Sequence, residues 1–265
     1  MTAGKCLSIR ASASAEEESN MSLYAIGDLH LCRQVPSKSM DAFGREWKNH
    51  EKKLMKNCRK MIADDDTLVL LGDHTWGKKM EQCEMDFKYI ESLPGRKILL
   101  RGNHDMFWDA KKTEKLTARF AGRLNFLQNN YYTYEDYALV GTKGYTFEGP
   151  FYLEDGHIAG WDRDKAEHAE KLVGREYIRL RESFEKASAD GYSRFIMFLH
   201  YPPTNILQTK SCFTDIAEQY GVEQVIYAHC HGAARWHDSI TGVKAGIKYK
   251  LASGDFLKWK PEKIL

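Results

Sequence analysis

From Leu23 onward, short apolar runs alternate with longer segments in which apolar residues recur at helical spacing. Runs of consecutive apolar and β-favouring residues predict buried strands. Strands are expected at residues 22–28, 67–73, 96–103, 137–147, 194–203, 223–232 and 246–253. Strands that alternate with helical segments are typical of layered α/β domains rather than of helix bundles or all-β sandwiches.

The segments between these strands predict amphipathic helices. In residues 46–62, Trp47, Leu54, Cys58 and Ile62 fall on one face of a helix. Further helices are expected at residues 80–92, 162–189 and 214–221, the last with Gly221 as its C-terminal cap. The long, highly charged helix among these is interpreted as presenting a solvated face.

The length of 265 residues is enough for one large domain that buries a substantial core. The body contains no internal repeat, low-complexity tract or linker, so a single domain is expected at residues 21–265. Residues 1–20 end in the polar sequence ASASAEEESN and lack the apolar core of a secretory signal. They are interpreted as a disordered leader.

Composition narrows the classes of function. A hydrophobic content of 43% and a charged content of 29% are typical of a globular protein. The formal net charge of +2 lacks the large excess of positive charge with which proteins usually bind long nucleic acids. The six cysteines are scattered without a CxxC pair, and no apolar run reaches the roughly 20 residues of a membrane-spanning helix. A cytoplasmic protein without a membrane partner is therefore expected.

Polar side chains follow the predicted strands at the points where the strands end. They are Asp28, His30, Asp73, His74, Asn103, His104, Asp105, His200, His229 and His231. In open α/β sheets, ligands bind in the crevice outside the carboxyl ends of the strands. We therefore expect these side chains to form a single site.

The chemistry of this set is that of a metal centre. Carboxylates, imidazoles and an amide are donors suited to divalent transition metals. Residues i and i+2 of an extended segment share a face, which pairs Asp28 with His30 and His229 with His231 and directs Cys230 away. Seven plausible ligands are too many for one four-coordinate ion, whereas two ions that share a bridging carboxylate would use them all.

The ordered motifs GDLH, GD at Gly72–Asp73, GNHD, the isolated His200 and AHCH resemble the five motifs of the calcineurin-like metallophosphoesterases. The resemblance spans Leu23 to His231 and is closest to small bacterial predicted phosphohydrolases. Five motifs in order are far more specific than any one of them, since a single GD or GN is usually turn chemistry. The family fold implies an α/β sandwich of two mixed β-sheets flanked by helices.

Carried over by position, the resemblance implies a set of metal ligands. One metal would be held by Asp28, His30 and His231, and the other by Asn103, His200 and His229. Asp73 would bridge the two ions. The expected cofactors are two divalent transition-metal ions from among manganese, iron, zinc and nickel.

The sequence departs from the family pattern at two positions. Ala228 stands where the family usually has glycine before the paired histidines, which is a mild change. His74 follows the bridging aspartate where an apolar or small residue is commoner, so it is expected to tune the site or to contact phosphate. Arg33, just after the first motif, is a second candidate for binding substrate phosphate.

The resemblance also implies the reaction. A water bound between two divalent ions becomes hydroxide near neutral pH and attacks the phosphorus of a phosphomonoester or phosphodiester. His104 is expected to face the substrate and assist the departing oxygen, and Asp105 to orient or electrostatically support that imidazole. The expected partner is a small phosphorylated substrate, for which a nucleotide is one option.

A different class of function is a non-catalytic interaction scaffold with the same fold. Such a protein should have lost ligands or the motif histidine, and here all are present. Aromatic residues close to the motifs are interpreted as packing residues, with stacking against a nucleobase or sugar as the alternative. They are Trp76, Phe107, Trp108, Trp161 and Tyr201.

Overall fold

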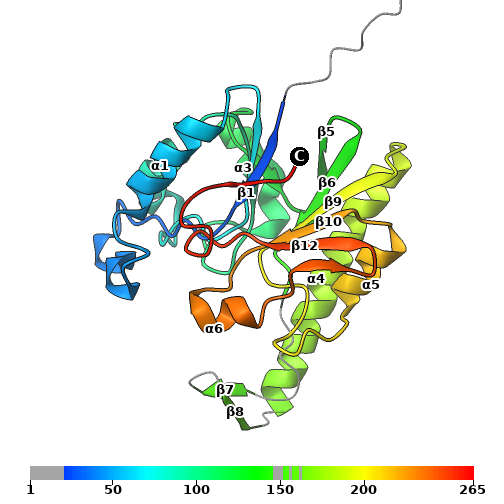
Figure 1. The fold of residues 1–265 in the computed structure, drawn as a ribbon. Helices are drawn as coiled ribbons and strands as arrows, with labels where there is room; N and C mark the ends of the chain where they lie inside the picture. The colour runs from blue at the N-terminus through cyan, green and yellow to red at the C-terminus, as the bar shows by residue number, and fades with distance from the viewer. Residues whose placement is uncertain (1–20, 146–151, 155–156, 161–162) are drawn as a thin grey trace, which may run out of the picture.

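The computed structural model of the chain describes residues 21–145, 152–154, 157–160 and 163–265 (Figure 1). The expected leader at residues 1–20 and the expected aromatic neighbour Trp161 lie outside the described residues. No helix of the described part of the chain is long and apolar enough to cross a membrane.

The first sheet has the strand order β13-β1-β2-β3-β4. Its strands are β1 (Leu23–Ile26), β2 (Thr67–Leu70), β3 (Arg96–Leu100), β4 (Asn125–Leu127) and β13 (Glu262–Lys263). The pairs from β1 to β4 are parallel, and β13 adds to β1 in the antiparallel sense. Because parallel strands run the same way, the carboxyl ends of β1, β2 and β3 share one edge.

The second sheet has the strand order β11-β12-β10-β9-β6-β5. Its strands are β5 (Tyr131–Tyr134), β6 (Tyr137–Thr142), β9 (Arg194–Leu199), β10 (Gln224–Tyr227), β11 (Gly242–Lys244) and β12 (Ile247–Leu251). The four inner strands are parallel and the two edge strands are antiparallel. A separate hairpin pairs β7 (Tyr152–Glu154) with β8 (His157–Gly160).

Helices cover the outer face of each sheet, on opposite sides of the molecule in Figure 1. The first sheet is covered by α1 (His50–Met61), α2 (Glu84–Glu91) and α3 (Thr113–Phe120). The second sheet is covered by α4 (Arg163–Ala189) and α5 (Cys212–Gln219), and α6 (Gly232–His237) follows β10. Short 3-10 turns lie at Pro36–Lys38, Met40–Phe43, Met80–Gln82 and Ala110–Lys112.

Alternation along each strand explains why its apolar run is continuous. In β1, Leu23 and Ala25 join the core between the two sheets, while Tyr24 and Ile26 join the core under the helices. In β2, Val69 faces the other sheet in the same way. Both faces of these strands are buried, so both sets of side chains must be apolar.

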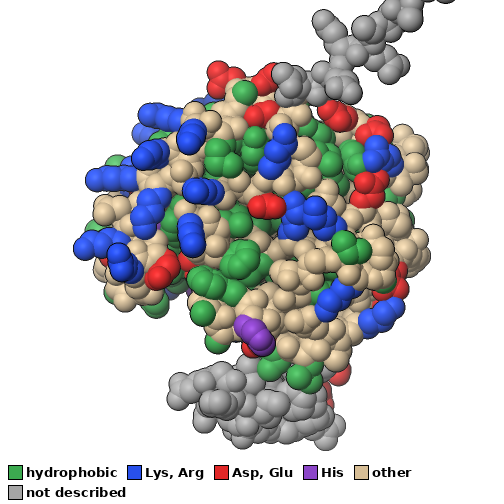
Figure 2. All heavy atoms as spheres, in the orientation of Figure 1, with side chains coloured by type: hydrophobic (Ala, Val, Ile, Leu, Met, Phe, Trp, Pro, Cys, Tyr) green, Lys and Arg blue, Asp and Glu red, His purple; other side chains and the backbone are tan. Residues whose placement is uncertain are grey.

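Helix α1 shows the opposite pattern, with one buried face and one solvated face. Leu54 and Cys58 are fully buried against the first sheet. Lysine and arginine side chains gather over this helix on the molecular surface (Figure 2). This division between faces is the periodicity that predicted the helix.

The predicted α/β sandwich of two mixed sheets with flanking helices is confirmed. Element boundaries differ in places from those expected. The helix expected at residues 46–62 begins at His50, and the one expected at 80–92 is divided into a 3-10 turn and α2 at Cys83. The sequence pattern did not predict helix α3 or strand β5. It predicted the strand that contains β6, but not the hairpin that β6 forms with β5.

Candidate metal centre

The chain turns sharply just after the strands that lead to the motifs. Asp28, His30, Asp73 and His229 have positive φ angles of 63°, 43°, 53° and 70°. This left-handed backbone is uncommon and strained for residues other than glycine, and such strain concentrates at functional sites. The extended backbone expected at these motifs is therefore wrong, because each strand has ended before its polar residues.

Two glycines of the motifs allow the turns to approach one another. A Cβ on Gly102 would lie 2.2 Å from both the backbone nitrogen and Oδ1 of Asp73. Gly72 has a φ of +91°, and a Cβ there would lie 2.7 Å from Nδ1 of His200. Neither position can accept a side chain without displacing a motif residue.

A first group of potential ligands consists of Asp28, His30 and His231, whose donor atoms lie within 4.8 Å of one another. Oδ1 of Asp28 is 3.8 Å from Nε2 of His231. Both atoms are buried and have no hydrogen-bond partner among the described residues. Buried polar atoms left without a partner are costly, so these two atoms favour a cation between them.

A second group consists of Asp73, His200 and His229. Oδ2 of Asp73 lies 3.5 Å from Nε2 of His200 and 3.6 Å from Nε2 of His30. Oδ1 of Asn103 is 2.7 Å from the same nitrogen of His200. Asp73 therefore lies within reach of both groups, and Asn103 within reach of the second. His229 and His231 belong to different groups, as the two expected ligand sets have them.

Burial sets the protonation of these groups. It raises the pKa of Asp28 to about 6 and lowers the pKa of His229 to about 3. The pKa of Asp73 is raised well above its ordinary value by burial and by the carboxylates of Asp105 and Asp28. The pKa of His200 is lowered well below its ordinary value by burial. Neutral imidazoles beside crowded carboxylates are a donor set that a divalent cation satisfies.

A sequence model of the calcineurin-like phosphoesterases matches residues 21–233. The chain belongs to this family. Membership makes it, in general terms, a phosphoester hydrolase that depends on divalent metal ions.

One solved structure shares this fold, and a second matches it more weakly. A phosphopantetheinyl hydrolase from Mycobacterium tuberculosis superposes with a TM-score of 0.52 at 13% identity, covering 92% of this chain and 95% of that chain. A protein of unknown function from Aquifex aeolicus gives a TM-score of 0.47 at 16% identity, covering 92% and 96%. No functionally curated protein matches the sequence.

Asp105 acts on the imidazole of His104 in this phosphoesterase through its charge, which works to raise the pKa of that ring against the effect of burial. Its carboxylate is fully buried and accepts backbone N–H bonds from Gly102 at 2.7 Å, Asp73 at 2.9 Å and His74 at 2.8 Å. The backbone N–H of His104 bonds instead to Oδ1 of Asp73, at 2.8 Å. Asp105 therefore fixes the backbone that carries Asp73, and it supports the imidazole of His104 electrostatically rather than through a hydrogen bond.

The side chain of His104 is open to solvent, unlike those of the buried ligands Asp28 and His200. Its side chain is 39% exposed, and its Nε2 lies 4.0 Å from Oδ2 of Asp73. The ring packs against Trp76, with centroids 4.3 Å apart. Burial of part of the ring lowers its pKa.

The two predicted substrate contacts do not reach the phosphoesterase site. His74 is fully buried, with its Nε2 2.8 Å from the carbonyl oxygen of Leu100. Arg33 pairs with Glu51 at 2.5 Å and lies over the ring of Tyr89. Without exposed surface His74 cannot contact a substrate phosphate, but its Nε2 lies 3.8 Å from Oδ2 of Asp105, so the expected tuning of the site stays a prediction. Arg33 lines a surface cavity beside α1.

Asp255 is a residue of the centre that the sequence reasoning missed. Its Oδ1 lies 3.1 Å from Nδ1 of His231, and its Oδ2 accepts the backbone N–H of Gly232 at 3.2 Å. A carboxylate bonded to the far nitrogen of a metal-ligating histidine fixes the orientation of that ring. The available signal was a further GD pair, Gly254–Asp255, which two residues separate from the end of β12.

A cavity of about 570 Å³ opens beside the first ligand group. His30, His104 and His231 form its inner wall. The outer wall is largely apolar and includes Met40, Phe43, Trp47, Trp76 and Trp236. Of the aromatic residues named from the sequence, Trp76 lines this cavity, while Trp108 is buried in the core and Tyr201 packs on His229, with centroids 4.1 Å apart.

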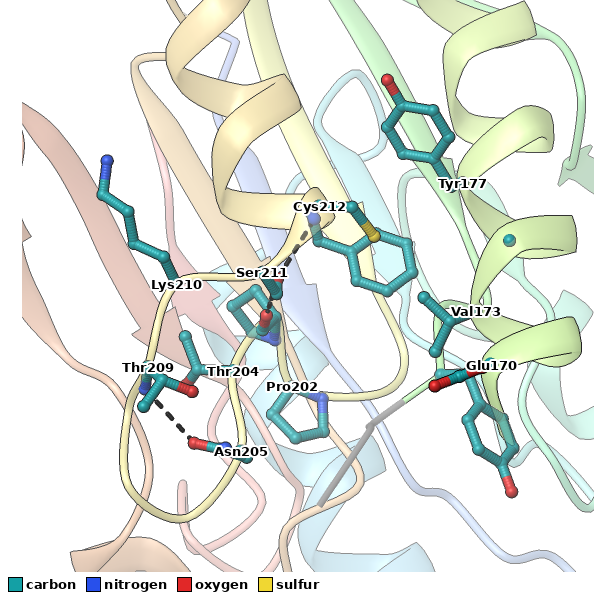
Figure 3. Close-up of a pocket in the computed structure, with 14 residues that line it drawn as sticks. Glu170, Val173, Tyr177, Pro202, Thr204, Asn205, Thr209, Lys210, Ser211 and Cys212 are labelled. Carbon is teal, nitrogen blue, oxygen red and sulfur yellow. Dashed lines mark hydrogen bonds between the residues drawn. The ribbon is translucent and has the colours of Figure 1, made fainter. Parts of the chain in front are cut away.

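A second cavity, of about 420 Å³, lies between α4, the start of α5 and the loop after β9 (Figure 3). Tyr177 and Val173 face it from α4, and Pro202 and Cys212 from the other side. Ser211 also lines it, and its hydroxyl caps α5 and donates to the carbonyl oxygen of Pro203 at 2.5 Å. None of the predicted ligands lines this cavity.

Proposed function

We propose that the chain is a cytoplasmic, dinuclear metallophosphoesterase that hydrolyses a small phosphomonoester or phosphodiester, with residues 21–265 acting as one domain. The observation that carries the proposal is the pair of ligand groups that meet at Asp73. The free thiols of the five described cysteines fit a reducing compartment.

The residues fit two divalent ions. Asp28, His30 and His231 would hold one ion, and Asn103, His200 and His229 the other. Asp73 would be shared. When bound, the two ions supply an activated water as nucleophile and neutralise the charge of the phosphoryl group. Imidazole, carboxylate and amide donors suit manganese, iron, zinc or nickel.

The protein's own groups have distinct tasks in this proposal. His104 faces the cavity, where its ring N–H can donate to the departing oxygen of the substrate. The packing of Trp76 on His104 and His30 limits the rotation of both rings. Asp105 holds the backbone turn of Asp73, and Asp255 holds the ring of His231. These contacts keep the donors oriented before any substrate binds.

The test is metal-restored turnover of two reporter esters. Chelated protein is reloaded in turn with manganese, zinc, iron and nickel and assayed with p-nitrophenyl phosphate and bis(p-nitrophenyl) phosphate. We expect at least one metal to restore hydrolysis, and the preferred ester then distinguishes phosphatase from phosphodiesterase.

Two variants sharpen this test. Asp73→Asn should lose metal binding and activity together, whereas Asp109→Asn, which alters an exposed acid at a 3-10 turn, should retain both. Full metal occupancy without turnover of either ester would contradict the catalytic proposal. It would favour the alternative function, a non-catalytic interaction scaffold with the same fold.

A further inference from the structure

The cavity beside the first ligand group joins a wall of histidines to a wall of aromatic side chains. His30, His104 and His231 line it on the side of the metal centre, and Trp76 and Trp236 are among the residues of the other wall. Its volume of about 570 Å³ lies in the range of small-molecule sites. The aromatic side chains belong to neither ligand group, so the cavity extends beyond what metal binding requires.

His104 connects the two walls. In the proposed function its ring meets the departing oxygen of the substrate, while the phosphate lies at the metal centre. The ring of Trp76 packs on the far side of this contact, with its centroid 4.3 Å from that of His104. A group attached to the departing oxygen must therefore extend past His104 into the part of the cavity that the indole rings line.

The aromatic wall is firmly held by its own packing. Trp47 is only 4% exposed, and its ring makes edge contacts with Trp259 at 5.1 Å and with His50 at 5.6 Å between centroids. Trp236 approaches from α6 and contacts the ring of Phe256 at 5.6 Å. Rings fixed in this way offer flat faces and edges at which another ring can pack.

Phe43 completes the wall from the surface. It lines the cavity, yet 70% of it is exposed. It ends the 3-10 turn Met40–Phe43, which is anchored by Met40 with only 5% exposure. An exposed large apolar side chain at the mouth of a cavity gains free energy when a ligand removes it from water.

The charges of the lining disfavour a second anionic group. Among the described residues, Glu46 and Asp255 are the charged groups that line the cavity besides the histidines, and no lysine or arginine does so. The carboxylate of Asp255 is engaged by His231. The ammonium of Lys38 lies 5.6 Å from the ring centroid of Trp76 but does not line the cavity. A phosphate or carboxylate here would lack the paired donors that such groups usually find.

We propose that this cavity binds the leaving group of the substrate, and that the leaving group carries a planar, uncharged ring packed between Trp76, Trp236 and Phe43. This inference rests on the proposed function and deepens it, because it names the substrate class as a phosphoester of a ring-bearing alcohol. An aryl group and a nucleobase share this chemistry, and direct binding measurements distinguish them.

Calorimetric titration of the zinc-loaded protein with phosphonates tests the cavity without requiring turnover, because their carbon–phosphorus bond replaces the ester bond. Benzylphosphonate should bind at least about tenfold more tightly than methylphosphonate, since the added ring leaves water for an apolar wall. Cyclohexylmethylphosphonate has similar apolar bulk but no planar ring, and it should bind at least about threefold more weakly than benzylphosphonate.

A phosphonate analogue of adenosine monophosphate distinguishes the two kinds of ring. Tighter binding of this analogue than of benzylphosphonate would support the proposal with a nucleobase as the ring. The opposite order, with benzylphosphonate still preferred to methylphosphonate, would support it with an aryl group.

Phe43→Ala removes an exposed ring that belongs to neither ligand group. The affinity for benzylphosphonate should fall by about fivefold, because one of the packing rings is lost, while the affinity for methylphosphonate should change by less than about twofold. Val243→Ala is the matched control, since Val243 is 69% exposed on β11 and does not line the cavity. Zinc content and thermal unfolding are measured for each variant.

Equal affinity for benzylphosphonate and methylphosphonate would overturn the proposal. An equal change in both affinities in Phe43→Ala, or equal binding of cyclohexylmethylphosphonate and benzylphosphonate, would overturn it as well. If the loaded protein hydrolyses no phosphoester, the proposed function fails, yet the phosphonate comparison still decides whether the cavity binds a ring. Hydrolysis of the reporter esters without a preference for benzylphosphonate would refute the ring-binding cavity alone.

Discussion

The histidines of the centre differ in solvent exposure. His30 and His200 are buried, with relative exposures of 3% and 0%, whereas the side chains of His231 and His104 are 30% and 39% exposed. Buried imidazoles with lowered pKa values remain neutral at physiological pH and suit metal ligation. The most exposed ring, that of His104, is the one free to meet a substrate.

His104→Ala should leave the metals bound and depress turnover by about 10²–10⁴, the range of general acid–base contributions. The reason is that His104 faces the cavity while the ligand groups are built from other side chains. Metal stoichiometry and kcat are measured on the same preparation. A variant with unchanged kcat would remove His104 from the mechanism.

Asp255→Asn should weaken metal binding by about 10–100-fold, as is usual when the orienting partner of a ligating histidine is altered. The carboxylate holds Nδ1 of His231 at 3.1 Å, so its loss frees the ring to rotate. Metal affinity is measured by competition with a chromophoric chelator. Asp238→Asn is the matched control, because Asp238 contacts the exposed His237 in the same way. Equal affinity in both variants would refute the positioning role.

Asp105 ties two elements together, since its oxygens accept from the turn after β2 and from the turn after β3. Asp105→Asn should lower the free energy of unfolding by about 3 kcal/mol, because hydrogen bonds to a buried charge are among the strongest in proteins. Urea unfolding of the chelated protein measures this. Asp109→Asn, which alters a 3-10 turn, should cost less than about 1 kcal/mol. Similar losses of stability in the two variants would contradict the proposal that Asp105 holds the turns after β2 and β3 together.

The sequence predicted the inner strands well because both faces of each are buried. Their apolar runs, as in β2 and β9, carry a signal that depends only on local composition. Strand β13 has only two residues and pairs with β1, which lies far away in the sequence. Such a strand is specified by its tertiary partner and leaves no local pattern.

For the site, the sequence indicated which residue types meet but not how the chain turns to bring them together. The left-handed backbone of Asp28 and His229 is imposed by the packing of neighbouring turns, which a rule of alternation cannot include. The expected phosphate contact of Arg33 failed for a related reason, since its ion pair with Glu51 depends on where α1 lies. Asp255 was missed because its partner His231 belongs to another strand end.

The metal centre depends on the whole molecule, because its ligands follow strands of both sheets. Metal affinity should rise by at least about tenfold from pH 5 to pH 7. Asp28 has its pKa raised by burial to about 6, so below that pH a proton competes with the metal for its carboxylate, and above it the carboxylate is free. The buried imidazoles of His30 and His200, with lowered pKa values, stay neutral across this window and add no further loss.

Affinity is measured with one metal at a series of pH values in non-coordinating buffers. An affinity that is constant from pH 5 to pH 7 would show that the carboxylates do not take part in binding.

The indole rings around the first ligand group give the protein an optical property. Trp76 stacks on His30 with centroids 5.0 Å apart, and Trp47 lies 5.2 Å from His231. An open-shell ion such as nickel at this position should quench tryptophan emission, whereas closed-shell zinc should leave it bright. Trp76→Phe should remove a large share of the quenched signal. Fluorescence thus reports metal loading in real time, with no label attached to the chain.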